Sequence, residues 1–197
     1  TPTRRQRQMC IRDRDIIMAK TTFQGPVKSI NGFQGVGTGN SVSIGAGATS
    51  LTVDTHAGRM LYHNVAGAAT LTLPAINSSS DSGVAGPGND PNSANNLGAS
   101  FEIYIGTTKT GSFILQVANA SDTMTGNAII VDTDTNDNAE GFMTAAASDT
   151  ITLNGSTTGG LAGTIITCKA IGANRWGVQV NTGGTGDAAT PFSAAVS

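Results

Sequence analysis

The sequence has little charge and few side chains that carry chemistry. Charged residues make up 12% of the 197 residues, about half the share of an ordinary soluble domain, and aromatic residues make up 5%. There are two histidines and two cysteines, Cys10 and Cys168, which lie far apart in the chain. A disulfide framework therefore does not fit, and we interpret Cys168, inside a strand-like run, as a buried thiol. No apolar run approaches the roughly 18 residues of a membrane-spanning helix.

The motifs of enzymes are missing as well. There is no G-x-S-x-G nucleophile elbow, and Lys109 in GTTKTG lacks the upstream glycine spacing of a phosphate-binding loop. The run GVGTGN at 35–40 lacks the third glycine of a dinucleotide fingerprint. His56 and His63, seven positions apart and without a cysteine pair, do not match a zinc motif, and we interpret them as surface or edge residues. We expect no catalytic residue, no cofactor and no enzymatic activity.

One acidic segment resembles a calcium loop at first sight. Asp132, Asp134 and Asn136 occupy the first three ligand positions of an EF-hand. Asp137 stands where the EF-hand needs glycine, Met143 stands where it needs glutamate, and no helices flank the segment. The EF-hand interpretation therefore fails. A solvated acidic turn is the main expectation, and an irregular Ca²⁺ site at Asp132, Asp134 and Asn136 is the alternative.

The sequence is rich in glycine, threonine and short β-branched runs. It contains 26 glycines, and no long segment has a helical period. Many short alternating segments with turn residues between them predict an all-β fold, an antiparallel β-sandwich or a barrel-like domain. Strands are predicted at 49–54, 59–65, 70–73, 100–106, 112–118, 128–132, 150–153, 164–171 and 175–180.

The segment 149–180 shows this pattern most clearly. The Asn154–Gly155 pair predicts a tight hairpin turn, because such turns need a positive φ that glycine adopts freely. A second turn is predicted between 171 and 175. Trp176 alternates with Val178 and Val180, so we predict that it belongs to the core and is not a platform for sugar stacking.

The composition divides the chain into segments. Residues 1–17 hold five of the 11 basic residues and stop before Met-Ala-Lys, a natural translation start, so we interpret them as a non-native extension. A basic arm that binds nucleic acid is the alternative. Residues 18–40 are expected to form an extended arm, and residues 183–197 a C-terminal tail. Between them, 41–182 should form the β domain, with a long loop at 77–97 whose composition cannot build a core.

The distribution of charge limits the partners. From Met18 onward, six basic residues stand against 11 acidic ones, so this part of the chain carries a formal charge of −5. Nucleic-acid binding relies on clustered Lys and Arg that neutralise phosphates, and an anionic membrane attracts the same residues. We therefore expect neither nucleic acid nor membrane as a partner.

Several segments, taken in order, resemble one family of small bacteriophage structural proteins. They are the start MAKTTFQGPVKSINGF, TLTLPA at 70–75, QVANASDTMTGNAIIVD at 116–132, the 149–180 region and the ending TPFSAA. From Met18 onward the chain is similar to the capsid decoration, or head-stabilising, proteins of tailed phages. Neither residues 1–17 nor the loop at 77–97 is expected from this resemblance.

The resemblance implies a structural role on the virion. It implies a β-rich trimer on the outer surface of the head that bridges units of the major capsid protein, after assembly in the host cytoplasm. An N-terminal arm would lie along the shell, with Phe23, Pro26, Val27 and Phe33 as candidate contacts; an unanchored terminus is the alternative. A competing hypothesis is a receptor-binding or adhesin module of a tail fibre or secreted protein, with the loops at 77–97 and 132–140 as its binding tip.

Overall fold

The computed structural model describes residues 40–78, 96–134 and 138–197. All of them belong to the compact unit that starts at Phe33. They form two β-sheets and one short helix, α1 (Val53–His56), so the predicted all-β class is confirmed. Among these residues no helix combines the length and the apolar character needed to cross a membrane.

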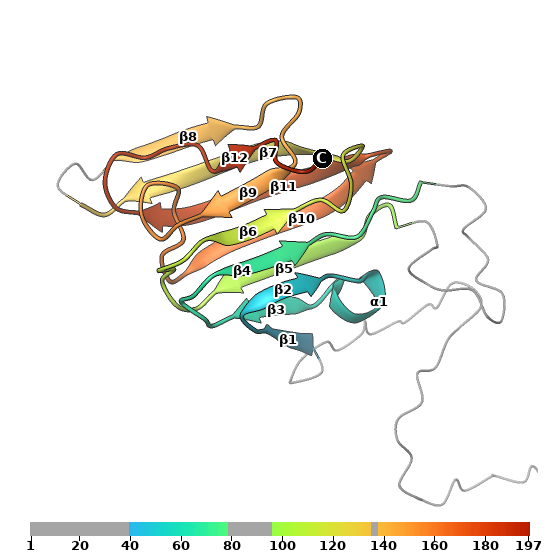
Figure 1. Cartoon of the computed structure of the whole chain (residues 1–197), viewed down its shortest axis with the longest axis horizontal. Helices are drawn as coiled ribbons and strands as arrows, with labels where there is room; N and C mark the ends of the chain where they lie inside the picture. Colours follow the sequence, from blue (N-terminus) through green and yellow to red (C-terminus); the bar gives the residue numbers. More distant parts are fainter. Residues whose placement is uncertain (1–39, 79–95, 135–137) are drawn as a thin grey trace, which may run out of the picture. The chain divides into compact units, whose positions relative to one another are not determined.

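The two sheets differ in size (Figure 1). Sheet A has seven strands, in the order β1 (Ser41–Ile44), β3 (Met60–His63), β5 (Ser100–Ile105), β10 (Thr164–Gly172), β11 (Arg175–Gly184), β7 (Thr123–Asp132) and β8 (Ala139–Met143). Sheet B has five strands, in the order β12 (Phe192–Ser193), β9 (Thr150–Leu153), β6 (Phe113–Gln116), β4 (Ala69–Thr72) and β2 (Gly47–Ser50).

The first six strands alternate between the two sheets, so this part of the chain winds as a coil. The odd-numbered strands β1, β3 and β5 pair in parallel in sheet A, and the even-numbered strands β2, β4 and β6 pair in parallel in sheet B. Each turn of the coil returns the chain in the same direction, which makes the neighbours within a sheet parallel. Five of the ten strand pairs are parallel. The prediction of antiparallel pairing throughout is therefore wrong, and both sheets are mixed.

The two turns predicted in 149–180 have different outcomes. Strands β10 and β11 form an antiparallel hairpin, and Asn174 takes φ 56° in its turn, a conformation that asparagine tolerates. Gly155 does adopt a positive φ, 78°, but β9 lies in sheet B and β10 in sheet A. The pair Asn154–Gly155 therefore begins a crossing between sheets, and the prediction of a tight hairpin there is wrong.

Both sheets contribute apolar side chains to one core. Trp176 is fully buried, which confirms its prediction as a core residue, and its ring meets that of Phe101 edge-on with 5.7 Å between centroids. Such aromatic pairs add to the free energy gained by burying the rings. Phe113 and Leu71 enter the same core from sheet B.

Three short strands and the helix lie outside the predicted pattern. The strand predicted at 49–54 is divided into β2 and α1, because the Thr52 hydroxyl caps the helix by accepting a hydrogen bond from the Thr55 amide at 3.4 Å. Strands β1, β8 and β12 were not predicted. Strand β12 is followed by backbone amides of Ala195 and Val196 that donate to the Asp149 carboxylate at 2.8 and 3.2 Å, which ties the C-terminal residues to sheet B.

Candidate functional site

Exposed apolar side chains gather on the outer face of sheet A, the face turned away from the core. The described residues include seven exposed large apolar side chains, and six of these lie on strands of this sheet. Alternation turns them outward, since their neighbours in the strands, such as Leu61 and Ile130, are buried. The six residues are Met60, Tyr62, Ile129, Val131, Met143 and Ile171.

The strand register aligns part of this surface into one row across five strands. The row consists of Tyr62, Tyr104, Ile165, Asn181 and Ile129, each directly opposite the next. Neighbouring strands lie about 4.8 Å apart, so each residue of the row is a close neighbour of the next. We call it the apolar row; its polar groups are the Asn181 amide and the hydroxyls of the two tyrosines.

Two tyrosines on the β3–β5 side of this face have defined neighbours. The Tyr62 ring lies over Gly106, where a Cβ would come within 2.2 Å of the Tyr62 hydroxyl. The Tyr104 hydroxyl donates a hydrogen bond of 2.6 Å to Glu102, and this bond raises the pKa of Tyr104. The Glu102 charge is therefore partly satisfied within the sheet.

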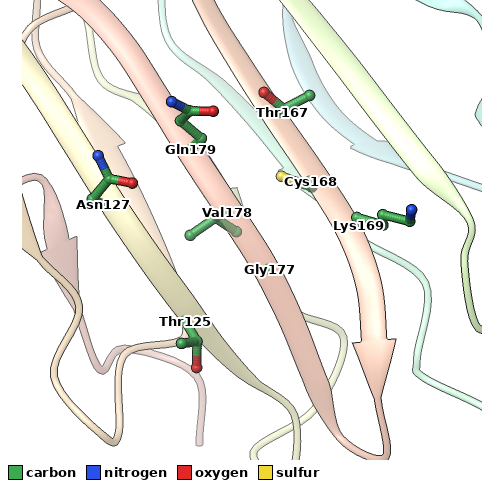
Figure 2. A pocket seen from close by; sticks show the side chains of 8 residues that line it. All are labelled: Thr125, Asn127, Thr167, Cys168, Lys169, Gly177, Val178 and Gln179. Atoms are coloured by element: carbon green, nitrogen blue, oxygen red, sulfur yellow. The ribbon is translucent and has the colours of Figure 1, made fainter.

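A shallow depression of about 340 Å³ lies in the middle of the same face (Figure 2). Gly177 leaves the space open, because it has no side chain between Lys169 on one neighbouring strand and Thr125 on the other. The remaining outward side chains around it are Asn127, Thr167 and Gln179. The outward side chains are polar and include a single charged group, Lys169, while Cys168 and Val178 add apolar surface. The depression can therefore accept and donate hydrogen bonds but offers no acid–base pair.

Cys168 lies beneath this depression and faces the core. It is fully buried, as predicted, and burial raises the pKa of its thiol to about 12. A thiol in this state is protonated at neutral pH and is a poor nucleophile. Cys168 therefore acts as a core residue.

A buried lysine lies at the end of the core, in contact with a buried histidine. The Lys109 ammonium is 2.9 Å from Nε2 of His63 and donates to the carbonyl oxygens of Val65 and Gly67, both at 2.6 Å. The Nδ1 atom of His63 lies 3.1 Å from the Ile44 carbonyl, which can only accept, so Nδ1 carries the proton and Nε2 accepts from Lys109. The three N–H donors of the ammonium thus meet three acceptors. His63 is buried and not at the surface, which corrects its prediction.

This cluster predicts that acid weakens the folded state. Burial, and next the Lys109 ammonium, lower the pKa of His63 below its ordinary value of 6.5. The unfolded chain takes up this proton near pH 6.5 and the folded protein does so only at lower pH. The free energy of unfolding is therefore greatest above pH 6.5 and decreases as the pH falls below it.

We expect a loss of up to about 2 kcal/mol between about pH 7 and pH 5, measured by urea unfolding. A His63→Gln variant carries an amide that can donate to the Ile44 carbonyl and accept from Lys109 but does not titrate, so its loss should be smaller. The pKa of His56 is also lowered by burial, and that residue is the same in both proteins. An equal loss in the two proteins would contradict the role given to His63.

Of the residues predicted to form a contact or a metal site, most lie outside the described ranges and two are described. Phe23, Pro26, Val27 and Phe33 lie outside the described residues, as does Asn136. Asp132 and Asp134 are described, and backbone amides occupy their carboxylates: the Asp134 amide donates to Asp132 at 3.0 Å, and the Gly186 amide to Asp134 at 2.8 Å. Within the described ranges, no three His, Cys, Asp or Glu residues come together in a way that could hold a metal ion.

The apolar residues on the outer face of sheet A can be predicted from the sequence. In the runs AIIV at 128–131 and MLY at 60–62, apolar residues occupy both phases of the strand alternation. Apolar residues on both faces of a strand indicate that both faces are to be covered. The strand prediction considered only the alternating residues that face the core, so the apolar residues that face outward were not predicted as a surface.

Comparisons of the chain with models of protein families, with curated proteins and with solved structures gave no match.

Proposed function

We propose that this chain is a non-enzymatic structural protein of a tailed-phage virion that decorates the outside of the capsid and stabilises it as a homotrimer. The resemblance of its segments to capsid decoration proteins supports this proposal, as does the low charge on the outer faces of its two sheets. In this proposal the sheets act as a sandwich-like body, and an extended arm at 18–40 contacts the shell through Phe23, Pro26, Val27 and Phe33.

One observation carries the proposal: the outer faces of both sheets hold very few charges. Sheet A, the larger one, has only Glu102, Lys169 and Arg175 on this face. Sheet B has no charged side chain at its outward strand positions, which are Ala48, Ser50, Thr70, Thr72, Ile114, Gln116, Thr150, Thr152 and Ser193.

Such faces suit permanent contacts with other proteins. Burying a charge between proteins costs desolvation free energy, and surfaces depleted of charge avoid most of this cost. Threonine hydroxyls can donate and accept hydrogen bonds across a contact. On a symmetric shell each contact is repeated, so individually weak contacts add up by avidity.

The position of the chain on the particle tests the proposal. We expect immunogold labelling of purified particles to place it on the head, and we expect removal of residues 18–40 to lower the temperature at which heads release their DNA toward that of heads lacking the protein. Label confined to tail fibres would contradict the proposal and favour the adhesin hypothesis. Unchanged heat release after the deletion would contradict the role of the arm.

A further inference from the structure

We infer that the outer face of sheet A, and not that of sheet B, seats on the partner, and that the partner presents an apolar, mildly acidic protein surface. This inference rests on the proposed function and names the contact that would perform it. It follows from the size, the apolar content and the charge of this face.

The size of the face fits a specific protein contact. Alternation along the seven strands of sheet A turns about two dozen residues outward, among them the glycines Gly141, Gly177 and Gly183. Standard protein–protein interfaces use roughly 20–30 residues on each side. The five strands of sheet B turn only about nine side chains outward, fewer than half of what such an interface uses.

The apolar content separates the two faces further. Sheet A carries six of the seven exposed large apolar side chains of the described residues, including Ile129 in the apolar row and Met143 at 73% exposure. Sheet B turns one large aliphatic side chain outward, Ile114, and it is only partly exposed. Contiguous exposed apolar surface on a folded protein marks a site that a partner covers.

The charges indicate what kind of surface the partner has. Of the four basic residues in the described ranges, Lys109 is buried, and Lys169 and Arg175 lie on the outer face of sheet A. Of the eight acidic residues there, only Glu102 lies on this face, and it accepts the hydrogen bond from Tyr104. The face is thus slightly positive on an acidic body, which is complementary to a mildly acidic partner.

The same charges disfavour a second copy of the chain as the occupant. Lys169 and Arg175 lie on β10 and β11, neighbouring strands in the middle of sheet A. Suppose that two copies met through the outer faces of their sheets A, related by a two-fold axis parallel to the strands. Their lysines and arginines would then lie close together across the contact, and like charges across an interface are costly. We therefore assign the face to a different protein surface, repeated on the particle.

Matched isoleucine variants test this assignment on phage heads that lack the protein. Purified protein is added to such heads and the bound fraction is measured by co-sedimentation. We expect Ile129→Asp to weaken binding at least tenfold, because it places a charge in the apolar row. Ile114→Asp, the same change on the outer face of sheet B, should bind within about twofold of the unchanged protein. Lys169→Glu, at an exposed position, should weaken binding about tenfold without affecting the fold, and serves if Ile129→Asp does not fold.

The outcomes separate the inference from the proposed function. If the unchanged protein does not bind the heads, the proposed function is wrong and the inference fails with it. If the unchanged protein binds, and Ile129→Asp and Lys169→Glu bind as tightly as it does, only the inference is overturned. A loss confined to Ile114→Asp would assign the contact to sheet B. A smaller mass by light scattering for Ile129→Asp, with unchanged head binding, would show that the face joins copies of the chain.

Discussion

A Gly126→Ala variant should fail to reach the native fold. Gly126 lies opposite Val178 in the parallel pair of β7 and β11. A Cβ at Gly126 would lie 1.7 Å from the Val178 carbonyl oxygen and 2.7 Å from its carbon. These are backbone atoms in the interior of sheet A, so they cannot move aside without breaking the register of two ten-residue strands. We expect a loss above about 4 kcal/mol, a large part of the stability of an ordinary domain, seen as the absence of a cooperative unfolding transition.

Gly141 provides the matched control. It lies on β8, the strand next to β7 in the same sheet, and a Cβ there would meet nothing within 4 Å. Gly141→Ala should change the free energy of unfolding by less than about 1 kcal/mol, toward greater stability, since alanine restricts the unfolded chain. If Gly126→Ala unfolded at the same denaturant concentration as the unchanged protein, β7 and β11 would not be neighbours in this register.

The strands could be predicted from the sequence because alternation is a local property. The prediction at 150–153 coincides with β9, and the in-phase positions of Trp176, Val178 and Val180 correctly placed the tryptophan in the core. Strand β8 was missed because its five residues, AEGFM, contain no β-branched residue and do not alternate.

The pairing of the strands could not be predicted in the same way. Alternation reports that one face of a strand is buried and carries no information on which strand lies beside it or in which direction. The parallel coil of β1 to β6 depends on connections that cross from one sheet to the other, as at Gly45 between β1 and β2. A positive φ, as at Gly155, is compatible with a hairpin and with such a crossing, so the Asn-Gly signal did not distinguish them.

The buried contact between Lys109 and His63 also could not be predicted from the sequence. Lys109 and His63 are separated by 46 positions, and each taken alone is typical of a surface. They meet because β3 ends where the connection between β5 and β6 passes, which is a consequence of the coil. The outward residues of sheet A could have been found locally, whereas this cluster required the topology.

Replacing Lys109 with methionine should destabilise the fold by about 3 kcal/mol. Methionine fills most of the volume and avoids the cost of burying an ammonium. It leaves the Nε2 atom of His63 and the carbonyls of Val65 and Gly67 without a donor, and each buried acceptor left unsatisfied costs about 1–3 kcal/mol. We expect three such losses to outweigh the relief of one desolvated charge. For a domain of this size the melting temperature should fall by about 6–12 °C, measured by calorimetry.

Lys169→Met is the matched control, since Lys169 is exposed on β10, and its melting temperature should stay within about 2 °C of that of the unchanged protein. The pH dependence distinguishes the loss of the ammonium from a simple packing defect. The Lys109 ammonium is one of the two causes that lower the pKa of His63, so removing it raises that pKa toward 6.5. Lys109→Met should therefore lose less free energy of unfolding between about pH 7 and pH 5 than the unchanged protein does. A variant that is destabilised but keeps the full acid dependence would show that the ammonium does not act on His63.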